Sequence, residues 1–396
     1  MDMWERIPLT SNYAAAYAAK DADVDVVAAY PITPQTPVVE KVAEFIANGE
    51  LNAEMIHVES EHSALSACIG ASATGARTFT ATSSQGLELM HEMLYIASGM
   101  RLPIVMAIAA RALSAPINIW CDYSDMFATR DSSWITMIAS TAQEVYDSII
   151  QAYKVAENPE VLLPAMVVYD GFIMSHTYEP VNVAKDRAPI LEYIPKNYSR
   201  PRLDPDNPIT FGAIADPNWY YEFKYQQVIA MKNAYEVLSK ADEEFGKRFG
   251  RSYGFVETYR IDDAETAIVT YGGLYGTVRE VVDILREKGA KVGGIKIRVF
   301  RPFPHKELVD SVKNVKHLIV LDRAISFGGA LEGPMAMEIL TTLRLRSIDV
   351  DLYNYIVGIG QRSVTELDII NIYYHASKLI EKGVRLTESI YWGVRE

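Results

Sequence analysis

The sequence has only two cysteines in 396 residues, Cys68 and Cys121. Two cysteines exclude a disulfide framework, and one chain cannot hold a four-cysteine iron–sulfur cluster with them. Long apolar stretches are also missing. The most apolar one, residues 102–110, is far shorter than the ~20 residues needed to span a bilayer, and it stops at Arg111. Residues 1–6 lack the basic-then-apolar layout of a signal peptide. We therefore expect a soluble, cytoplasmic protein.

Positive charge is in deficit, with 38 Lys and Arg against 51 Asp and Glu, which gives a net charge of -13. This balance argues against nucleic acid or an anionic membrane as a partner. The 7 histidines are scattered, and His57 and His62 lack the spacing of a helical metal-ligand pair, so we predict no metal site. The remaining composition, 49% hydrophobic and 22% charged, is ordinary for a globular protein, and the length favours two or three domains.

Strand and helix patterns alternate from residue 24 to residue 175. Short apolar or β-branched runs predict strands at 26–29, 54–58, 77–82, 103–109 and 162–169. Helical spacing predicts helices that begin at Pro37, with Thr36 as the N-cap, and at 64–74 and 87–99. This alternation is typical of an α/β fold with a doubly wound, mainly parallel sheet and right-handed crossovers.

The stretch 25–37 organises the chain, because it runs from a buried strand through a stiff loop into a helix. Pro31 and Pro34 fix the backbone on either side of Thr33 and hold its hydroxyl at the carboxyl end of the strand. Open α/β sheets bind their ligands at that edge. The same residues are equally consistent with a proline-stiffened connection that binds nothing.

Unusual polar residues follow four of the predicted strands: Thr33, Glu61, Ser84 with Gln85, and Arg111. Strand ends of this kind share one edge of a doubly wound sheet, so these groups are expected to converge on one cleft.

Two of these residues also have plain structural interpretations. Glu61 precedes a helix of small residues, where a carboxylate, or Glu59 in its place, would act as an N-terminal cap. Arg111 follows an apolar strand and needs an anionic partner, which is either a substrate carboxylate or an internal aspartate. The internal candidates are Asp122, Asp125 and Asp131.

The pattern changes in the second half. Repeated prolines predict an extended linker at 187–217, and the charged stretch 219–253 predicts a solvated amphipathic helix that bridges domains. A second α/β unit begins near Thr266, with strands predicted at 267–271, 292–299 and 318–322. Its glycine turn at 272–276 is neither a dinucleotide fingerprint nor a P-loop, which favours a structural turn over a phosphate cradle. We therefore divide the chain into domains at 1–185 and 261–396, with the linker and bridging helix at 186–260.

Motifs spread over nearly the whole chain resemble the alpha subunit of pyruvate:ferredoxin oxidoreductase, in the family's order and spacing. They are Tyr30-Pro31-Ile32-Thr33-Pro34, the segments 58–63, 80–86 and 111–116, and, for a second, transketolase-C-terminal-like domain, 271–273 and 301–304. The resemblance implies a pyrimidine-type thiamine-diphosphate fold in the first domain.

The resemblance also implies an activity. Such enzymes convert a 2-oxoacid and coenzyme A to acyl-CoA and CO2 with thiamine diphosphate, and they pass two electrons to ferredoxin. The cofactor is then shared with a beta subunit, which holds Mg2+ and a 4Fe–4S cluster. A delta-type subunit carries two further clusters, and a gamma-type subunit completes a hetero-oligomer. The chain alone would be colourless and inactive.

Residue by residue, the resemblance implies that Glu61 hydrogen-bonds the cofactor's aminopyrimidine and that Thr33 bonds a substrate oxygen. Arg111 would pair with the substrate carboxylate. The remaining predicted cofactor-binding residues are Tyr30, Pro31, Ser84 and Gln85, and none is predicted to bind a metal.

Two departures from the family pattern affect the substrate. Ala110 stands where asparagine is common, and the segment 122–125 reads Asp-Tyr-Ser-Asp instead of Asp-His-Gln-Asp. Thr33 argues against oxalate, since an oxalate-specific relative has arginine there. Pyruvate is the leading substrate and a branched-chain 2-oxoacid such as 2-oxoisovalerate is the second. A non-catalytic scaffold is the interpretation from another class, which the joint presence of Glu61, Thr33 and Arg111 disfavours.

Overall fold

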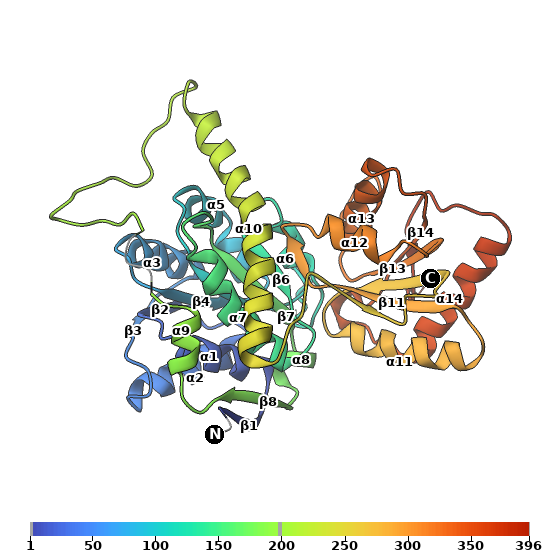
Figure 1. Cartoon of the computed structure of the whole chain (residues 1–396), viewed down its shortest axis with the longest axis horizontal. Coiled ribbons are helices and arrows are strands. Elements are labelled where there is room, and N and C mark those ends of the chain that lie inside the picture. Colours follow the sequence, from blue (N-terminus) through green and yellow to red (C-terminus); the bar gives the residue numbers. More distant parts are fainter. Residues whose placement is uncertain (1–2, 197–199, 396) are drawn as a thin grey trace.

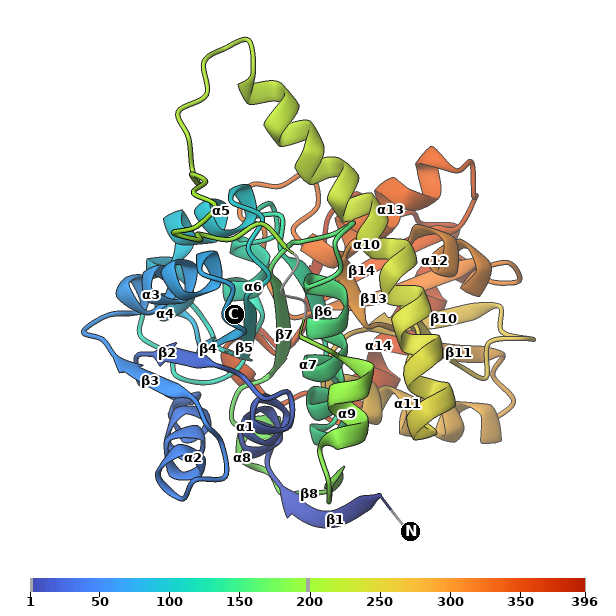
Figure 2. The same cartoon turned by 60° about the vertical axis from the view of Figure 1, so that its left-hand side comes forward.

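The computed structural model describes residues 3–196 and 200–395. Figure 1 shows two α/β units side by side, with the long helix α10 (Tyr220–Phe249) running past the junction between them, and Figure 2 shows helices on both faces of the first unit. Each unit is built around its own sheet. The predicted α/β class, with a parallel-sheet domain followed by a second α/β domain, is confirmed.

The first sheet has seven strands in the order β12-β6-β7-β5-β4-β2-β3, and all of its neighbouring pairs are parallel except β12 with β6. Its central strands carry buried side chains at every position, as expected for a sheet covered on both faces. The strands are β2 (Val26–Ala29), β3 (Glu54–His57), β4 (Thr78–Thr82), β5 (Val105–Ala110), β6 (Ile135–Ile138), β7 (Ala165–Asp170) and β12 (Val299–Arg301).

Helices cover both faces of this sheet. The core on one face involves α1, α2, α7 and α10, and the core on the other involves α3 and α5. The helices of this unit are α1 (Ser11–Asp21), α2 (Thr36–Ala47), α3 (Glu61–Ala73), α4 (Gln85–Leu89), α5 (His91–Gly99), α6 (Ser124–Ala128), α7 (Ala142–Ala156), α8 (Ile173–His176) and α9 (Ala188–Tyr193). A two-stranded antiparallel ribbon, β1 (Trp4–Leu9) with β8 (Glu179–Ala184), lies beside them.

The second sheet has six strands in the order β15-β14-β13-β10-β11-β9, and only β9 is antiparallel to its neighbour. Its strands are β9 (Val256–Tyr259), β10 (Thr266–Thr270), β11 (Val292–Ile297), β13 (His317–Asp322), β14 (Asp351–Ile356) and β15 (Ile390–Tyr391). The helices of this unit are α11 (Leu274–Glu287), α12 (His305–Ser311), α13 (Pro334–Leu345), the 3-10 turn η1 (Ile359–Gln361) and α14 (Glu366–Glu381).

Three sequence-based boundaries are wrong. Thr36 is not an N-cap but the first residue of α2, because the preceding Gln35 already has helical backbone angles. The small-residue helix begins at Glu61 and not at residue 64, because Ser60 caps it by accepting a hydrogen bond from the Ser63 amide at 3.2 Å. The helix expected at 87–99 is two helices, α4 and α5, with a break at Met90.

The sequence analysis missed β6 and α7, which lie between the predicted strands at 103–109 and 162–169. It also read 292–299 as one strand. The strand β11 ends at Ile297, and after Arg298 the chain crosses to the first sheet, where β12 pairs with β6. The second half of the sequence therefore contributes the edge strand of the first sheet.

The bridging helix is α10, and its C-terminal half is not simply solvated. Leu238, Ala241 and Phe245 are buried in the core that also contains α7. The domain boundaries at residues 185 and 260 stay predictions. Within residues 3–196 and 200–395, no helix combines the length and apolar character that crossing a bilayer requires.

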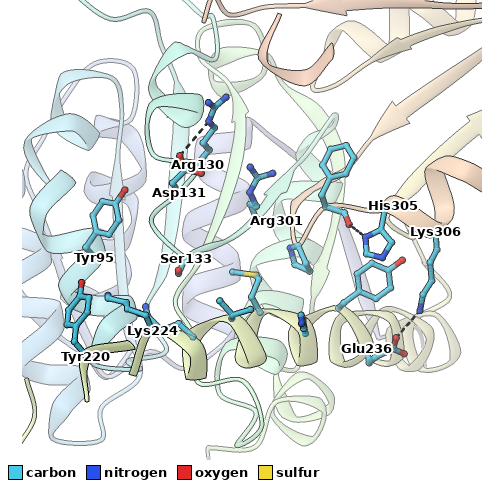
Figure 3. Close-up of a pocket in the computed structure, with 17 residues that line it drawn as sticks. Tyr95, Arg130, Asp131, Ser133, Tyr220, Lys224, Glu236, Arg301, His305 and Lys306 are labelled. Atoms are coloured by element: carbon cyan, nitrogen blue, oxygen red, sulfur yellow. Dashed lines mark hydrogen bonds and ion pairs between the residues drawn. The ribbon is translucent and has the colours of Figure 1, made fainter. Parts of the chain in front are cut away.

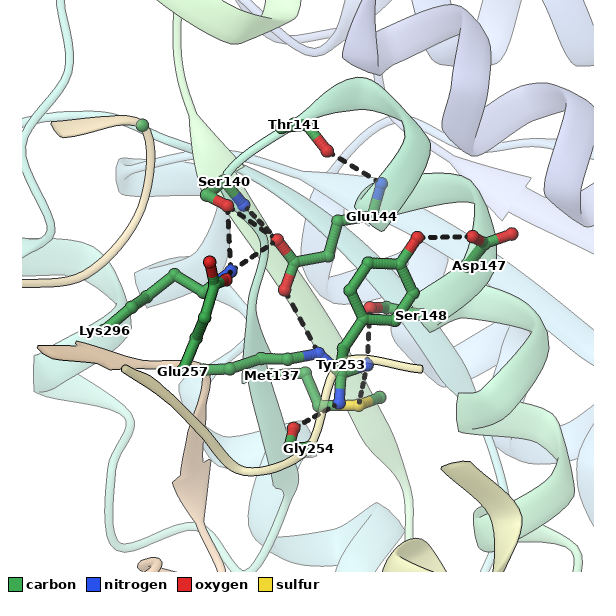
Figure 4. Close-up of polar contacts among 12 residues, drawn as sticks. Met137, Ser140, Thr141, Glu144, Asp147, Ser148, Tyr253, Gly254, Glu257 and Lys296 are labelled. Atoms are coloured by element: carbon green, nitrogen blue, oxygen red, sulfur yellow. Dashed lines mark hydrogen bonds and ion pairs between the residues drawn. The ribbon is translucent and has the colours of Figure 1, made fainter. Parts of the chain in front are cut away.

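Buried contacts join the two units. One apolar cluster contains Met106 of β5, Val269 of β10 and Phe300 of β12, so the cores are continuous. Next to it lies a charged cluster in which Glu144 of α7 accepts from Lys296 and pairs with Arg298 (Figure 4). Lys296 comes from the end of β11, and Arg298 comes from the crossover between the sheets.

Candidate functional site

The candidate site lies at the carboxyl ends of β2, β4 and β5. The loop after β2 is fixed from below: Asn12 of α1 donates to the Pro34 carbonyl at 2.7 Å, and Tyr169 of β7 donates to the Asn12 amide oxygen at 2.8 Å. Tyr30 and Thr33 are exposed on this loop. A rigid loop that presents exposed side chains is a suitable frame for a ligand.

Glu61 is the first residue of α3, and its side chain is 6% exposed. Since Ser60 is the cap, the interpretation of Glu61 as the capping residue is wrong. Its neighbour Glu59 points outward and accepts a hydrogen bond from the Ser63 hydroxyl. Burial raises the pKa of the Glu61 carboxyl, and its own backbone amide opposes this only in part. No other described residue donates to it, so Glu61 is a buried carboxyl group without a partner from elsewhere in the described residues.

Gly86 allows the start of α4 to pack closely against this carboxyl group. A Cβ atom at Gly86 would lie 2.5 Å from Glu61 Oε1 and 2.5 Å from Thr82 Oγ1. Thr82 is itself buried, and its hydroxyl has no hydrogen-bond partner among the described residues. The backbone at Gly86 thus packs tightly against two buried side chains, and one of them, Thr82, has a hydroxyl that is unsatisfied within the described residues.

Arg111 meets the loop of Thr33. Its Nη1 donates to the Thr33 carbonyl at 2.9 Å and its Nε donates to the Asn118 carbonyl at 3.0 Å. Burial lowers the pKa of this guanidinium, and Asp125 counteracts the effect in part. The guanidinium forms no ion pair with any carboxylate of the described residues, so the structural pairing with Asp122, Asp125 or Asp131 is not formed.

Ser84 forms structural hydrogen bonds within this chain. Its backbone has φ of +49°, its hydroxyl donates to the Ala112 carbonyl at 2.5 Å, and its amide donates to Asp125 Oδ2 at 2.9 Å. Gln85 is half-buried and begins α4. The cofactor contacts predicted for Ser84, Gln85, Tyr30 and Pro31 stay predictions.

Asp125 is a residue that the sequence analysis named only as a possible ion-pair partner. Its Oδ2 accepts from the amides of Ser84 and Arg111, and its Oδ1 accepts from the Met126 amide at 2.8 Å. It is completely buried, and burial raises its pKa to about 7 although the amides favour ionisation. Asp125 thus ties the ends of β4 and β5 together, and no local pattern signals that role.

A second missed group joins this edge to the second unit. Asp170, at the end of β7, accepts hydrogen bonds from Tyr123, from Arg323 and, at 2.9 Å, from the Gly273 amide. The turn at Gly272 and Gly273 therefore serves as a packing element, as the favoured interpretation of that turn predicted. Within the described residues, no group of three or more His, Cys, Asp or Glu side chains is arranged to hold a metal ion.

Comparison with known proteins gives consistent results along the chain. Residues 17–243 match the family model "Pyruvate flavodoxin/ferredoxin oxidoreductase, thiamine diP-bdg", and residues 264–369 match "Pyruvate:ferredoxin oxidoreductase core domain II". The pyruvate synthase subunit PorA of Methanocaldococcus jannaschii is 53% identical over 375 residues, which cover 93% of this chain and 94% of the relative.

Two further relatives bear on the substrate and the fold. The ketoisovalerate oxidoreductase subunit VorA of Pyrococcus horikoshii is 49% identical over 386 residues, 97% of this chain and 96% of the relative. A solved 2-oxoglutarate:ferredoxin oxidoreductase from Magnetococcus marinus superposes with a TM-score of 0.70 at 19% identity. That likeness, which concerns the fold alone, covers 93% of this chain and 65% of the other chain.

Proposed function

This chain belongs to the pyruvate:ferredoxin oxidoreductase family as its alpha subunit, and from that premise we propose that it forms half of a thiamine-diphosphate site acting on pyruvate. The reaction is the CoA-dependent oxidative decarboxylation of pyruvate to acetyl-CoA and CO2, or the reverse synthesis, with ferredoxin as the electron carrier. The observation that carries the proposal is the buried carboxyl group of Glu61, to which no other described residue donates a hydrogen bond, beside the closely packed Gly86.

The residues fit the aminopyrimidine of thiamine diphosphate. A ring nitrogen of this cofactor needs a carboxyl group that shares a proton with it in a site of low dielectric. Burial raises the pKa of Glu61, which favours the protonated carboxyl group that this sharing requires. When bound, the cofactor supplies the electron sink for cleavage of the bond between the carboxylate and the carbonyl carbon. Glu61 holds a proton at its Oε atoms and shares it with the ring nitrogen.

Thr33 and Arg111 act on the substrate in this proposal. Arg111 orients the substrate carboxylate with a charge-assisted hydrogen bond, and its contact with the Thr33 carbonyl fixes both groups relative to each other. The exposed Thr33 hydroxyl donates to the substrate's oxo group. Because the guanidinium is buried and has no internal carboxylate, an incoming carboxylate would satisfy it.

We assign the groups that bind the metal, the diphosphate and the clusters to partner subunits. The chain's two cysteines are both buried and free, and burial raises the pKa of each thiol, so neither is suited to ligate a cluster. We assign Mg2+, the diphosphate-binding half of the site and the 4Fe–4S clusters to beta-, gamma- and delta-type partners, with CoA as co-substrate, in the cytoplasm.

A branched-chain acid such as 2-oxoisovalerate is the second candidate, because the pyruvate synthase and ketoisovalerate oxidoreductase relatives are about equally similar to this chain. Ala110 and Tyr123, which depart from the family pattern, are fully buried. Tyr123 packs edge-on against Tyr271 at 5.0 Å between ring centroids. Neither side chain reaches the exposed surface of this chain, so any effect on substrate choice would pass through Arg111 or Asp170.

The test is turnover of the complex copurified with this chain, measured with CoA and a low-potential dye. Pyruvate, 2-oxoisovalerate, 2-oxoglutarate and oxalate are compared at equal concentrations. We expect the highest kcat/KM with pyruvate. A clear preference for 2-oxoisovalerate would move the proposal to the second candidate. A complex that contains thiamine diphosphate and intact clusters but turns over none of these acids would overturn the proposal in favour of a scaffold.

A further inference from the structure

The N-terminal part of α10 projects from the body of the protein together with the segment before it, as Figures 1 and 2 show. None of the residues 220–226 is buried. The projection nevertheless carries large apolar side chains, which are Ile214, Trp219, Tyr221, Phe223, Tyr225 and Val228, exposed by 48% or more. We call these six residues the aromatic ridge. Exposed aromatic side chains in such density mark an interaction surface.

The ridge is anchored to the helices that form the candidate site. Before the ridge, the Leu203 amide donates to the carbonyl of Ala73, the last residue of α3, at 2.7 Å. After it, Gln227 donates to Ser98 of α5 at 3.2 Å. The same helix α3 begins with Glu61. The ridge therefore projects from the scaffold that carries the proposed cofactor contact.

A basic cleft of about 830 Å³ continues the ridge along α10, and Tyr220 and Val228 line it (Figure 3). Its walls carry five basic side chains and only two carboxylates, Asp131 and Glu236; the basic ones are Arg130, Lys224, Lys232, Arg301 and Lys306. Arg301 and Lys306 are paired with Glu338 and Glu236, at 2.6 and 3.2 Å.

Among the other cations of the cleft, only Arg130 has a carboxylate partner within the described residues. Lys224 contacts the Gln227 amide oxygen, and Arg130 approaches Asp131 only to 3.8 Å. Lys232 is exposed and has no partner among the residues that the structure describes. In a chain with a net charge of -13, this is a local excess of positive charge. It is electrostatically complementary to carboxylates.

We propose that the ridge and the basic cleft form one docking surface for a different subunit of the same complex, which presents an apolar face bordered by carboxylates. The inference rests on the proposed function, because that function requires partner chains. A second copy of this chain fits less well. A two-fold interface would place the same patch against its own copy, which has no excess of carboxylates to offer the basic cleft.

Zero-length carbodiimide cross-linking of the purified complex tests this surface, since the reagent joins an amine only to a carboxylate in direct contact. We expect Lys232 to be linked to an aspartate or glutamate of another subunit, as identified by mass spectrometry. Lys382 is the matched control, because it is exposed at the end of α14 and has no side-chain partner among the described residues. Its cross-linking to another subunit should be absent.

A ridge variant gives an independent readout. Tyr221→Ser with Phe223→Ser changes only exposed side chains, and we expect the complex to lose a subunit on gel filtration. Leu367→Ser, on α14 and 65% exposed, is the matched control and should leave the assembly intact. The double variant Lys224→Glu with Lys232→Glu should also lose a subunit from the complex. In the native complex, high salt should weaken the same interface.

Two results would overturn the docking surface. One is a cross-link from Lys232 to a second copy of this chain, recognised by mixing isotopically labelled and unlabelled protein. The other is an intact complex in the ridge variant with no cross-link at Lys232. If that complex still turns over pyruvate at the native rate, the proposed function stands. A cross-linked complex that turns over no 2-oxoacid would instead refute the proposed function and retain the surface.

Discussion

Glu59 and Glu61 are two residues apart at the start of α3, but their surroundings are opposite. Glu59 faces solvent and accepts from the Ser63 hydroxyl, which lowers its pKa. Glu61 is buried without a partner, and burial raises its pKa. A carboxyl group that is buried but unpaired destabilises the folded protein when it ionises. Such a residue is retained when a ligand supplies the missing partner.

The pair of glutamates provides a matched test of the catalytic role. In the assembled complex, Glu61→Ala should lower kcat about 10²–10⁴-fold, the range for loss of a general acid–base group, while Glu59→Ala should retain native turnover. Dye reduction with pyruvate and CoA measures the effect, and the thiamine diphosphate content shows whether the cofactor is still bound. Native turnover in Glu61→Ala would remove the residue from the mechanism.

The same residue predicts a pH dependence of stability. Its folded pKa lies above the ordinary value of 4.5, so the unfolded chain releases this proton at lower pH than the folded chain does. The free energy of unfolding therefore falls as the pH rises from 4.5 through the folded pKa. Glu61→Gln has no such proton to release, so its Tm should match the native Tm at low pH and exceed it increasingly at higher pH. Parallel Tm curves for the two complexes would contradict this prediction.

Arg111 and Arg101 offer a second matched pair at opposite ends of β5. Both donate to backbone carbonyls, Arg111 to that of Thr33 and Arg101 to those of Val161 and Leu162. Only Arg111 lies at the carboxyl edge. Arg111→Lys keeps the charge but loses the planar fork, so kcat/KM for pyruvate should fall by roughly tenfold to a hundredfold, the value of a charge-assisted hydrogen bond. Arg101→Lys should leave steady-state kinetics unchanged, and equal losses in both variants would assign Arg111 a structural role.

At the scale of elements, the short helix α4 approaches Glu61 closely because Gly86 has no side chain. A Cβ there would come within 2.5 Å of both Glu61 Oε1 and Thr82 Oγ1, so Gly86→Ala must displace the carboxyl group. We expect a loss of turnover of about 10²-fold, since a shift of about 1 Å in a catalytic group has that effect. Assembly and cofactor content should persist.

Gly276→Ala serves as the control for the glycine substitution. Gly276 lies in α11, and a Cβ there would meet nothing within 4 Å. This change should stabilise the protein by about 0.5–1 kcal/mol without affecting turnover. If Gly86→Ala behaved in the same way, the close approach of Gly86 to Glu61 would have no role in the reaction.

Elements with a strong local pattern were predictable. Strand β2 spans 26–29, as predicted, because its short apolar run has no competing helical pattern in the neighbouring sequence. The crossover at Arg298 was not predictable, because residues 292–299 have the pattern of one continuous strand. What separates β11 from β12 is tertiary: the buried Arg298 guanidinium donates to Gly254, Ser148 and Gln151. Local periodicity cannot indicate partners that are so distant in the sequence.

The residues of the candidate site also differ in whether local sequence or tertiary contacts identify them. Thr33, Glu61 and Arg111 were identifiable from their positions after apolar strands and from the family motifs. Asp125 and Asp170 were not identified as site residues, since their importance depends on what meets them in space. Asp170 and Arg323 pair across 153 residues of sequence. The residues that hold the candidate site together are therefore less visible in the sequence than those proposed to face the ligand.

For the whole molecule, the junction between the units depends on Glu144. Burial opposes its ionisation, but Lys296 and Arg298 outweigh burial and hold the pKa of Glu144 below its usual range. Lys296 and Arg298 are 2% and 0% exposed, so both lie almost entirely out of contact with water. Breaking such a buried cluster by removing one partner is far more damaging than loss of a surface pair.

We therefore expect Glu144→Gln to lower the free energy of unfolding by about 3–5 kcal/mol, since it leaves the buried Arg298 guanidinium without its carboxylate. The two units should also separate in calorimetry, with an earlier transition for one of them. Glu243→Gln is the control, because Glu243 forms an exposed pair with Lys247 at 2.5 Å and its loss should change stability by less than about 0.5 kcal/mol. Equal effects of the two changes would mean that the apolar contacts alone hold the units together. The charged cluster would then contribute nothing to the junction that places Asp170 next to Arg323.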